Sequence, residues 1–462
     1  MANFIKDLKA ALKGSEKNFT TGSIDRAIFL LAVPMILEML MESLFAVVDA
    51  YFVSNYVGIN GVATVGLTES VITLIYATAI GMSMAATAVV ARRVGEGNHK
   101  AAAISAMQAI IISSSISIVL GVLGFIFAPD ILRFMGADEQ VIAEGAQYTR
   151  ILFGSNIVIM LLFLLNGIFR GAGDANIAMR SLWIANILNI ILDPCFILGW
   201  GPFPEMGLTG AAVATTIGRG CGVAYQITML SSKKSIIQIN WETFTIRWDI
   251  IKQILKIGFN GVLQFLISSA SWIFLMRIMA GFGSSAVAGY TIAIRIIIFT
   301  ILPAWGMANA AATLVGQNLG AKKPDRAEQS VWKAARYTVI FLTLIAILFF
   351  FFAKNLIGFF LEDPAAVKEG VNSLRIICFG YLFFGYGMVI AQSFNGAGDT
   401  WTPTKINLIA FWALQIPLAY IFAYQLEWNT NGVYWAIAIS ESVLALISIY
   451  LFRKGKWKLM QV

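Results

Sequence analysis

The chain has 462 residues, of which 58% are hydrophobic and only 13% are charged, and its mean hydropathy is +0.78. Soluble domains are about 45–50% apolar and about 25% charged, so these values exclude a water-soluble enzyme. One histidine and three scattered cysteines (Cys195, Cys221 and Cys378) are too few for a zinc centre or a disulfide framework, which also excludes metal-centred and redox chemistry.

In chain order, roughly twelve apolar segments are long enough to cross a bilayer. They predict helices rather than barrel strands, because each run is long and uniformly apolar. Before them, residues 1–26 are basic and lack the continuous apolar stretch of a cleavable signal peptide. The expected spans are 27–53, 62–90, 102–128, 147–169, 178–200, 208–231, 251–280, 286–315, 333–353, 371–394, 404–425 and 431–452.

The net charge of +8 comes from basic residues in the connections that follow even-numbered segments. The opposite connections are short and neutral or lean acidic, so the positive-inside rule predicts that both termini are cytoplasmic in a multi-pass inner (plasma) membrane protein. Because loop asymmetry accounts for the charge, we expect no nucleic-acid partner. Examples of the basic connections are Arg92, Arg93 and Lys100, Lys322, Lys323 and Arg326, and the tail Arg453, Lys454, Lys456 and Lys458.

The two halves of the chain repeat each other. Residues 81–82 match 306–307, and 171–174 match 396–399, both at an offset of 225, whereas Gly210 and Gly432 differ by 222. A duplicated unit of six helices enters the membrane twice from the same side, so its lobes are related by a pseudo-twofold axis along the membrane normal, with a substrate site between them. We expect a segment 1–26, lobes 27–231 and 251–453, a linker 232–250 and a tail 454–462.

Several motifs resemble the multidrug and toxic compound extrusion (MATE) family, in order and spacing, over essentially the whole chain. They lie at residues 31–36, 48–54, 91–95, 166–176, 188–194 and 210–215. The resemblance implies a twelve-helix secondary exporter, and it brings Asp49 and Asp193 together.

The first span contains three carboxylates, Glu38, Glu42 and Asp49. At 100° per residue all three fall on one helical stripe, which we interpret as the wall of a polar cavity. A charge at the centre of a membrane helix costs about 2.5–3.5 kcal/mol, so such residues usually face a cavity. Glu42 and Glu38 could instead lie near a water-filled mouth.

The fifth span adds Asn189 and Asp193, which share a face, followed by Pro194, which frees a backbone carbonyl. Asn166, Tyr148 and Thr215 supply neutral oxygens. Such a set suits a shared proton or Na⁺, the latter held by Asp49, Asp193, Asn189 and Thr215. Alternatively, Asp193 forms a structural hydrogen bond, and the three neutral residues join helices.

The second half lacks the aspartates, because the positions 225 after Asp49 and Asp193 are Phe274 and Leu418. Ion coupling is therefore assigned to the N-terminal lobe, which is similar to the DinF-like branch of the family. A flexible apolar wall for organic cations could include Met41, Phe45, Tyr290, Trp305 and Met307, although plain packing explains them too. The roles of Arg277, Arg295 and Glu441 stay open.

No G-x-x-x-x-G-K-[ST] phosphate loop is present, so an ion gradient rather than ATP must drive transport. We expect a monomeric exporter of organic, cationic or amphipathic compounds, without a cofactor, in which H⁺ or Na⁺ binding bends the first helix near Pro34. The alternatives are a flippase for lipid-linked oligosaccharides and a non-transporting scaffold or channel.

Overall fold

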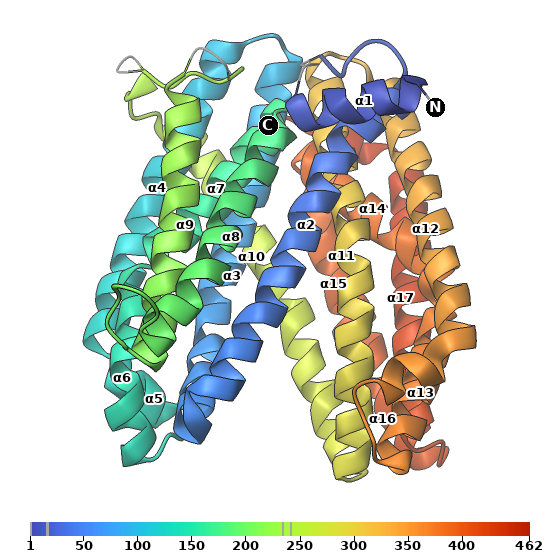
Figure 1. The fold of residues 1–462 in the computed structure, drawn as a ribbon. Coiled ribbons are helices and arrows are strands. Elements are labelled where there is room, and N and C mark those ends of the chain that lie inside the picture. The colour runs from blue at the N-terminus through green and yellow to red at the C-terminus, as the bar shows by residue number, and fades with distance from the viewer. Residues whose placement is uncertain (1, 15–17, 233–234, 241–242) are drawn as a thin grey trace.

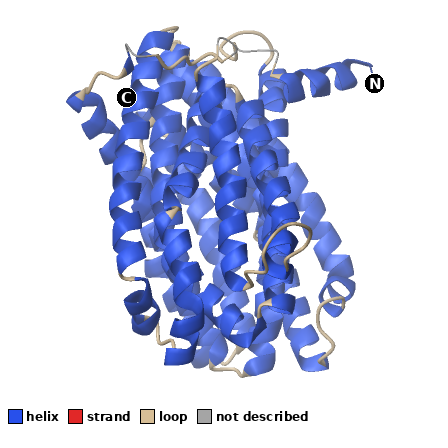
Figure 2. Cartoon of the chain, turned by 60° about the vertical axis from the view of Figure 1, so that its left-hand side comes forward, coloured by secondary structure: helices blue, strands red, loops and turns tan. Residues whose placement is uncertain are grey.

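In the computed structural model, residues 2–14, 18–232, 235–240 and 243–462 are described, and these form helices and connecting loops without strands (Figure 2). Parts of the expected N-terminal segment and linker, namely residues 1, 15–17, 233–234 and 241–242, lie outside this description. The all-helical fold predicted from the sequence is confirmed.

Helices α2 to α9 form one lobe and the elements from α10 to α17 form the other, while α1 lies across the end of the bundle that carries both termini (Figure 1). The first lobe contains α2 (Ile24–Tyr56), α3 (Gly58–Gly95), α4 (His99–Ile126), α5 (Ala128–Phe134), α6 (Glu139–Gly154), α7 (Asn156–Ala172), α8 (Ala175–Leu198) and α9 (Leu208–Leu230), preceded by α1 (Ala2–Lys13). The second contains α10 (Trp248–Ala280), α11 (Ser284–Gly320), α12 (Pro324–Gly358), α13 (Pro364–Cys378), α14 (Tyr381–Ala397), α15 (Trp401–Asn407), η2 (Leu408–Gln415), α16 (Ile416–Tyr420), η3 (Ile421–Gln425), α17 (Thr430–Arg453) and η4 (Lys456–Leu459).

Within the described ranges, ten helical stretches are long and apolar enough to cross a membrane, and the bent pair α13 and α14 forms an eleventh span. One of the ten, Glu139–Ala172, joins α6 and α7 through Ser155. Helix α9 has 23 residues but is less apolar, because it contains Arg219 and several threonines. With α9 as the sixth, the spans follow the twelve segments expected from the sequence.

The internal repeat is visible in matching backbone conformations. Helices α7 and α14 both end at a glycine with a left-handed backbone, Gly173 (φ 88°) and Gly398 (φ 89°), which are related by the offset of 225. Helices α9 and α17 both follow a residue with φ of 52°, Gly207 and Asn429, at the shorter offset of 222. Positive φ favours glycine or asparagine, so the repeated residues preserve repeated turns.

The eleventh span differs from its counterpart α8, which is one continuous helix. It contains the two π-helical stretches η2 and η3 on either side of α16. Pro194 and Pro417 are related by an offset of 223 rather than 225, so the second lobe is two residues shorter than the first between the repeated Gly-Ala-Gly-Asp turn and this proline.

The lobes meet closely at the end that carries the termini. A Cβ atom on Gly95 of α3 would collide with the carbonyl oxygen of Gln317, and one on Gly320 of α11 would collide with that of Arg92. Because positions 95 and 320, like 92 and 317, are related by the repeat offset, the same contact occurs twice about the pseudo-twofold axis. Only glycine permits this separation of the two backbones.

Hydrogen bonds between the lobes reinforce this contact. The amide of Gln317 donates to the Gly171 carbonyl over 3.0 Å, and Arg92 donates to the Met460 carbonyl over 2.8 Å. On the outside, Lys333 of α12 forms an ion pair with Asp25 of α2 at 2.6 Å. The lobes are therefore fastened to each other at the end where both termini lie.

Gly95→Ala should destabilise the protein, because the added methyl group meets backbone that cannot rotate away. Overpacking of this kind costs about 1–3 kcal/mol, measurable as a lower Tm in detergent. Gly66→Ala in the same helix is the control, since nothing lies within 4 Å of its added Cβ, and it should leave Tm unchanged or raise it. Equal Tm values for the two variants would contradict the close contact.

Candidate functional site

Asp193 and Asn189 face the interior of the N-terminal lobe from α8. The amide orientation of Asn189 that satisfies every partner donates to Asp193 Oδ2 at 3.0 Å and accepts from both the backbone N and Oγ1 of Thr215 at 3.1 Å. The i, i+4 pairing expected from the sequence is thus present. Asp193 and Asn189 are almost completely buried, at 0% and 1% exposure, so these three residues form a fixed polar cluster between α8 and α9.

Asp49 approaches this cluster from α2, which packs along α8. Its carboxylate is close enough to Asp193 for the two charges to repel each other. Tyr148 of α6 is buried and within electrostatic range of both aspartates. Among the described residues, no Lys, Arg or His side chain forms an ion pair within 4.0 Å with Asp49 or Asp193, in contrast to Glu38 and Glu42.

The oxygen atoms of this group are of the type that hard cations prefer. Two carboxylates, the Thr215 hydroxyl and the Asn189 amide fit a small monovalent cation or a proton shared between the acids. No cluster of three or more His, Cys, Asp or Glu side chains is found in the residues described. The set is therefore better suited to Na⁺ or H⁺ than to a tightly held divalent metal.

Glu42, two turns before Asp49 on α2, is paired with a buried arginine. Arg219 Nη2 lies 3.3 Å from Glu42 Oε1, and Asn186 donates to Glu42 Oε2 over 3.1 Å. The guanidinium also lies 5.2 Å from the centre of the Phe45 ring and is only 2% exposed. Its charge additionally acts on Asp49. The charge of Arg219 therefore acts on both Glu42 and Asp49.

Glu38 is held by a separate network. Asn166 of α7 donates to Glu38 Oε1 over 3.0 Å and accepts from Gln226 over 2.6 Å. Arg170 Nη1 lies 3.7 Å from the same carboxylate oxygen. Asn166, which we expected beside the aspartates, has both ends of its amide engaged here instead. Its partners make Asn166 a support for Glu38.

A cavity of about 240 Å³ lies between the lobes. Glu42 and Arg170 contribute the charged part of its wall, Phe163, Phe265 and Trp305 the aromatic part, and a chain of three amides the neutral polar part. In that chain Gln392 donates to Asn309 over 2.8 Å, and Asn395 donates to Gln392. A cavity therefore lies between the lobes, where the sequence predicted a substrate site.

Trp305 and Glu42 are the residues proposed from the sequence for cavity contacts that line this space. The others lie elsewhere: Tyr290 stacks on Tyr434 at 6.1 Å, Met307 packs in the core near α2, Met41 is buried, Phe45 contacts Arg219, and Glu38 is enclosed by its network. For Tyr290, Met41 and Met307 the packing interpretation fits the structure better. Pro34 lies within α2, which is continuous from Ile24 to Tyr56.

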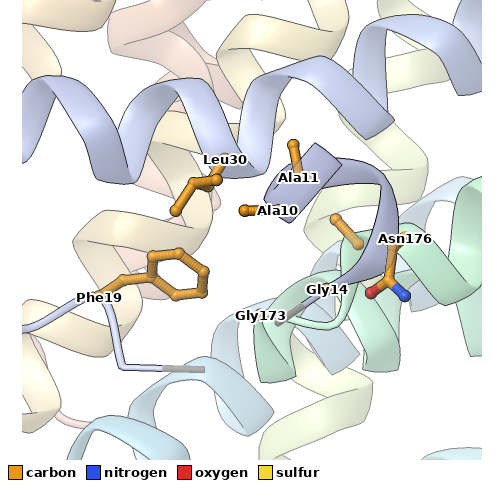
Figure 3. A pocket seen from close by; sticks show the side chains of 8 residues that line it. Ala10, Ala11, Gly14, Phe19, Leu30, Gly173 and Asn176 are labelled. Carbon is orange, nitrogen blue, oxygen red and sulfur yellow. The ribbon is translucent and has the colours of Figure 1, made fainter. Parts of the chain in front are cut away.

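A much smaller pocket lies beneath α1, between Ala10, Phe19 and Asn176 (Figure 3). Its volume of about 10 Å³ is room for about one water molecule. This pocket therefore cannot be the substrate site.

Arg219 is a buried residue of this candidate site that the sequence analysis missed. It lies in the glycine-rich run 218–222, which suggested close helix packing, and the glycines do pack closely: Cβ atoms on Gly218 and Gly222 would meet α8. The rule that drew attention to the carboxylates, a charge inside an apolar span, applies equally to Arg219 and could have identified it. Its partner, Glu42, could not be inferred without the fold.

The chain was compared with known families, proteins and structures. The MatE family profile matches residues 34–195 and 259–421, one match in each lobe. "Probable multidrug resistance protein YoeA" of Bacillus subtilis is 26% identical over 95% of this chain and 96% of its own length. "Probable multidrug resistance protein NorM" of Thermotoga maritima is also 26% identical, over 94% of this chain and 93% of its own.

A crystal structure of a MATE protein in complex with MaD3S superimposes with a TM-score of 0.90 at 26% identity, covering 96% of this chain and 98% of that one. The similarity in sequence and in fold therefore extends over both lobes.

Arg219→Met should destabilise the protein, because it leaves the Glu42 carboxylate without its cation. Removing one partner of a fully buried pair costs about 3–5 kcal/mol, and since the Glu42 side chain is 25% exposed we expect the low end of that range. The combination Arg219→Met with Glu42→Gln should recover most of the lost Tm. A double variant no more stable than Arg219→Met alone would show that the two charges are not coupled.

Proposed function

This chain belongs to the MatE family of membrane transporters and is not an enzyme, and from that premise we propose that it is a multidrug exporter driven by an ion gradient. The exported compounds are organic and cationic or amphipathic. The driving ion, H⁺ or Na⁺, binds at Asp49 and Asp193. This assignment agrees with the names of YoeA and NorM, which describe multidrug resistance.

The proposal is carried by the distribution of charge in the N-terminal lobe. Of the acids along its interior, Glu38 lies near Arg170 and Glu42 is paired with Arg219, whereas Asp49 and Asp193 have no cation within 4.0 Å among the described residues. Two neighbouring carboxylates away from water are stable only if they take up a positive charge. A proton or Na⁺ supplies that charge and leaves again when the site is rehydrated.

Arg219 provides the physical link between this ion site and the interlobe cavity. While Asp49 is ionised, it competes with Glu42 for the guanidinium; once Asp49 is neutralised, Arg219 is held by Glu42 alone. Because Glu42 lines the cavity, loading of the ion changes the charge that a substrate meets there. The two ligands therefore exclude each other through one side chain, as antiport requires.

The conformational step involves α2, which carries Glu38, Glu42 and Asp49 on one stripe. Pro34 removes one helical hydrogen bond from this helix, so we propose that it bends there when the aspartates are neutralised. Bending would move the Glu42 carboxylate and shrink the space between the lobes. The substrate would then leave the cavity on the side away from the termini.

The composition of the cavity suits amphipathic organic molecules. Trp305, Phe163 and Phe265 provide flat apolar surface and can contact a cation through their ring faces, while the amides offer donors and acceptors. A lipid-linked oligosaccharide flippase would instead need several cations for a pyrophosphate group. The cavity contains one arginine, Arg170, which already donates to Ser83 over 3.1 Å.

The orientation follows from the basic residues at the end of the bundle that carries the termini. We propose that this end is cytoplasmic, in a monomeric protein of the inner membrane, and that the chain belongs to the DinF-like branch because its acids cluster in the N-terminal lobe. We also propose the division into a segment 1–26, lobes 27–231 and 251–453, a linker 232–250 and a tail 454–462.

Asp49→Asn and Asp193→Asn should each abolish gradient-driven export of ethidium, a flat organic cation, because an amide binds neither H⁺ nor Na⁺ in exchange. The assay uses purified protein in liposomes, with a pH gradient in one set and a Na⁺ gradient in another. Glu205→Gln, at an exposed carboxylate in the same lobe, is the control and should transport normally. Undiminished flux in both aspartate variants under either gradient would refute the ion site.

A further inference from the structure

Glu441 lies in the middle of α17, about midway between its ends at Thr430 and Arg453. At 1.5 Å per residue it is about 17 Å from either end of the helix, near the centre of a bilayer core of about 30 Å. A carboxylate at this depth is costly unless it has a function or a partner.

The side chain of Glu441 is 9% exposed, and no hydrogen bond or ion pair is recorded for it in the described part of the chain. Its neighbours one turn away on the same face, Ile437 and Ala445, are 2% and 0% exposed. Glu441 therefore projects from the face of α17 that packs into the C-terminal lobe.

The internal repeat shows which residue of the first lobe corresponds to Glu441. At the offset of 222 that relates α9 to α17, Glu441 is the counterpart of Arg219. In the first lobe Arg219 meets Glu42, but the positions 225 after Glu42 and Asp49 are Ile267 and Phe274. At the corresponding positions, the second lobe thus has a buried acid in place of the buried arginine, and apolar residues in place of two acids that act on that arginine.

The elements packed against α17 bring no compensating charge to this depth. Helix α14, α16 and the π-helical stretches carry no charged residue, and those of α10 lie within nine residues of its start or four of its end. In α13, Glu369 accepts from Tyr434 and Arg375 donates to a carbonyl of α12. The charged and titratable side chains on these elements are Asp249, Lys252, Lys256, Arg277, Lys368, Glu369, Arg375, Cys378, Tyr381, Tyr386, Lys405, Tyr420, Tyr424, Tyr434, Tyr450, Arg453, Lys456 and Lys458.

We propose that Glu441 is a proton-binding site of the C-terminal lobe, separate from the aspartate pair of the N-terminal lobe. An ionised carboxylate without a counter-charge is strongly disfavoured away from water, and a proton is the one cation that needs no further ligand. A metal ion would require additional oxygens, whereas an organic cation bound in the interlobe cavity would not meet Glu441, which does not line that cavity.

The consequence for transport rests on the proposed function. In a cycle driven by a pH gradient, Glu441 takes up a proton when the C-terminal lobe opens to the acidic side and gives it up on the other. Each lobe then carries protons independently, although their backbones are related by the repeat.

Infrared difference spectroscopy of the full-length protein in lipid tests this site without any transport. At neutral pH the wild type should show a carbonyl band from a protonated carboxylic acid that is lost in Glu441→Gln and shifted in Glu441→Asp. Glu427→Gln, at an exposed carboxylate of the same lobe, is the matched control and should keep the band unchanged. The band should also persist in the Asp49→Asn/Asp193→Asn double variant.

A spectrum unchanged by both Glu441 substitutions at every pH would overturn the proposal, as would a Glu441 that titrates together with exposed carboxylates. This result is distinguishable from failure of the exporter assignment. If the Glu441 band is absent while the aspartate variants still abolish ethidium export, only the second site is refuted; if the band is present but no gradient drives export, only the exporter is refuted.

Discussion

Placing a charged group away from water costs several kcal/mol unless an opposite charge or several hydrogen bonds accompany it. In the N-terminal lobe this cost is met in two ways. Glu42 has Arg219, and Glu38 has Asn166 with Arg170 beyond it. Among the described residues Asp49 and Asp193 lack such partners, and Asn189 gives Asp193 only a neutral hydrogen bond. In the proposed function, this uncompensated cost gives the pair an affinity for H⁺ or Na⁺, which binds and is later released.

The two lobes share a backbone plan but differ in their interior charges. Paired turns at Gly173 and Gly398, and reciprocal contacts of Gly95 and Gly320, keep the lobes related about one axis. Side chains are not bound by that symmetry. Phe274 is the counterpart of Asp49 at the repeat offset, and the centre of its ring lies 5.4 Å from that of Trp412. The two lobes thus share a framework in which one contains the acid pair and the other contains a single buried acid.

Much of this arrangement could be predicted from the sequence. Hydropathy indicated the spans, and the repeat offset indicated two lobes, because apolar runs and repeated motifs can both be recognised in the sequence alone. The pairing of Asn189 with Asp193 followed from helical spacing. The partners of Glu42 and Glu38 could not be predicted, since they come from α9 and α7 and depend on how helices distant in sequence pack. For the same reason Tyr290, an aromatic like Trp305, proved to stack in the core while Trp305 lines the cavity.

The central claim is that the aspartate pair holds a cation which the transported compound displaces. Its most direct test is whether that cation is released when ethidium is added to purified protein in weakly buffered detergent solution. A pH electrode and a Na⁺-selective electrode monitor the release simultaneously. The account predicts that the wild type releases one of the two cations and that the Asp49→Asn/Asp193→Asn double variant, which still binds ethidium, releases neither. Equal release from both proteins would contradict it.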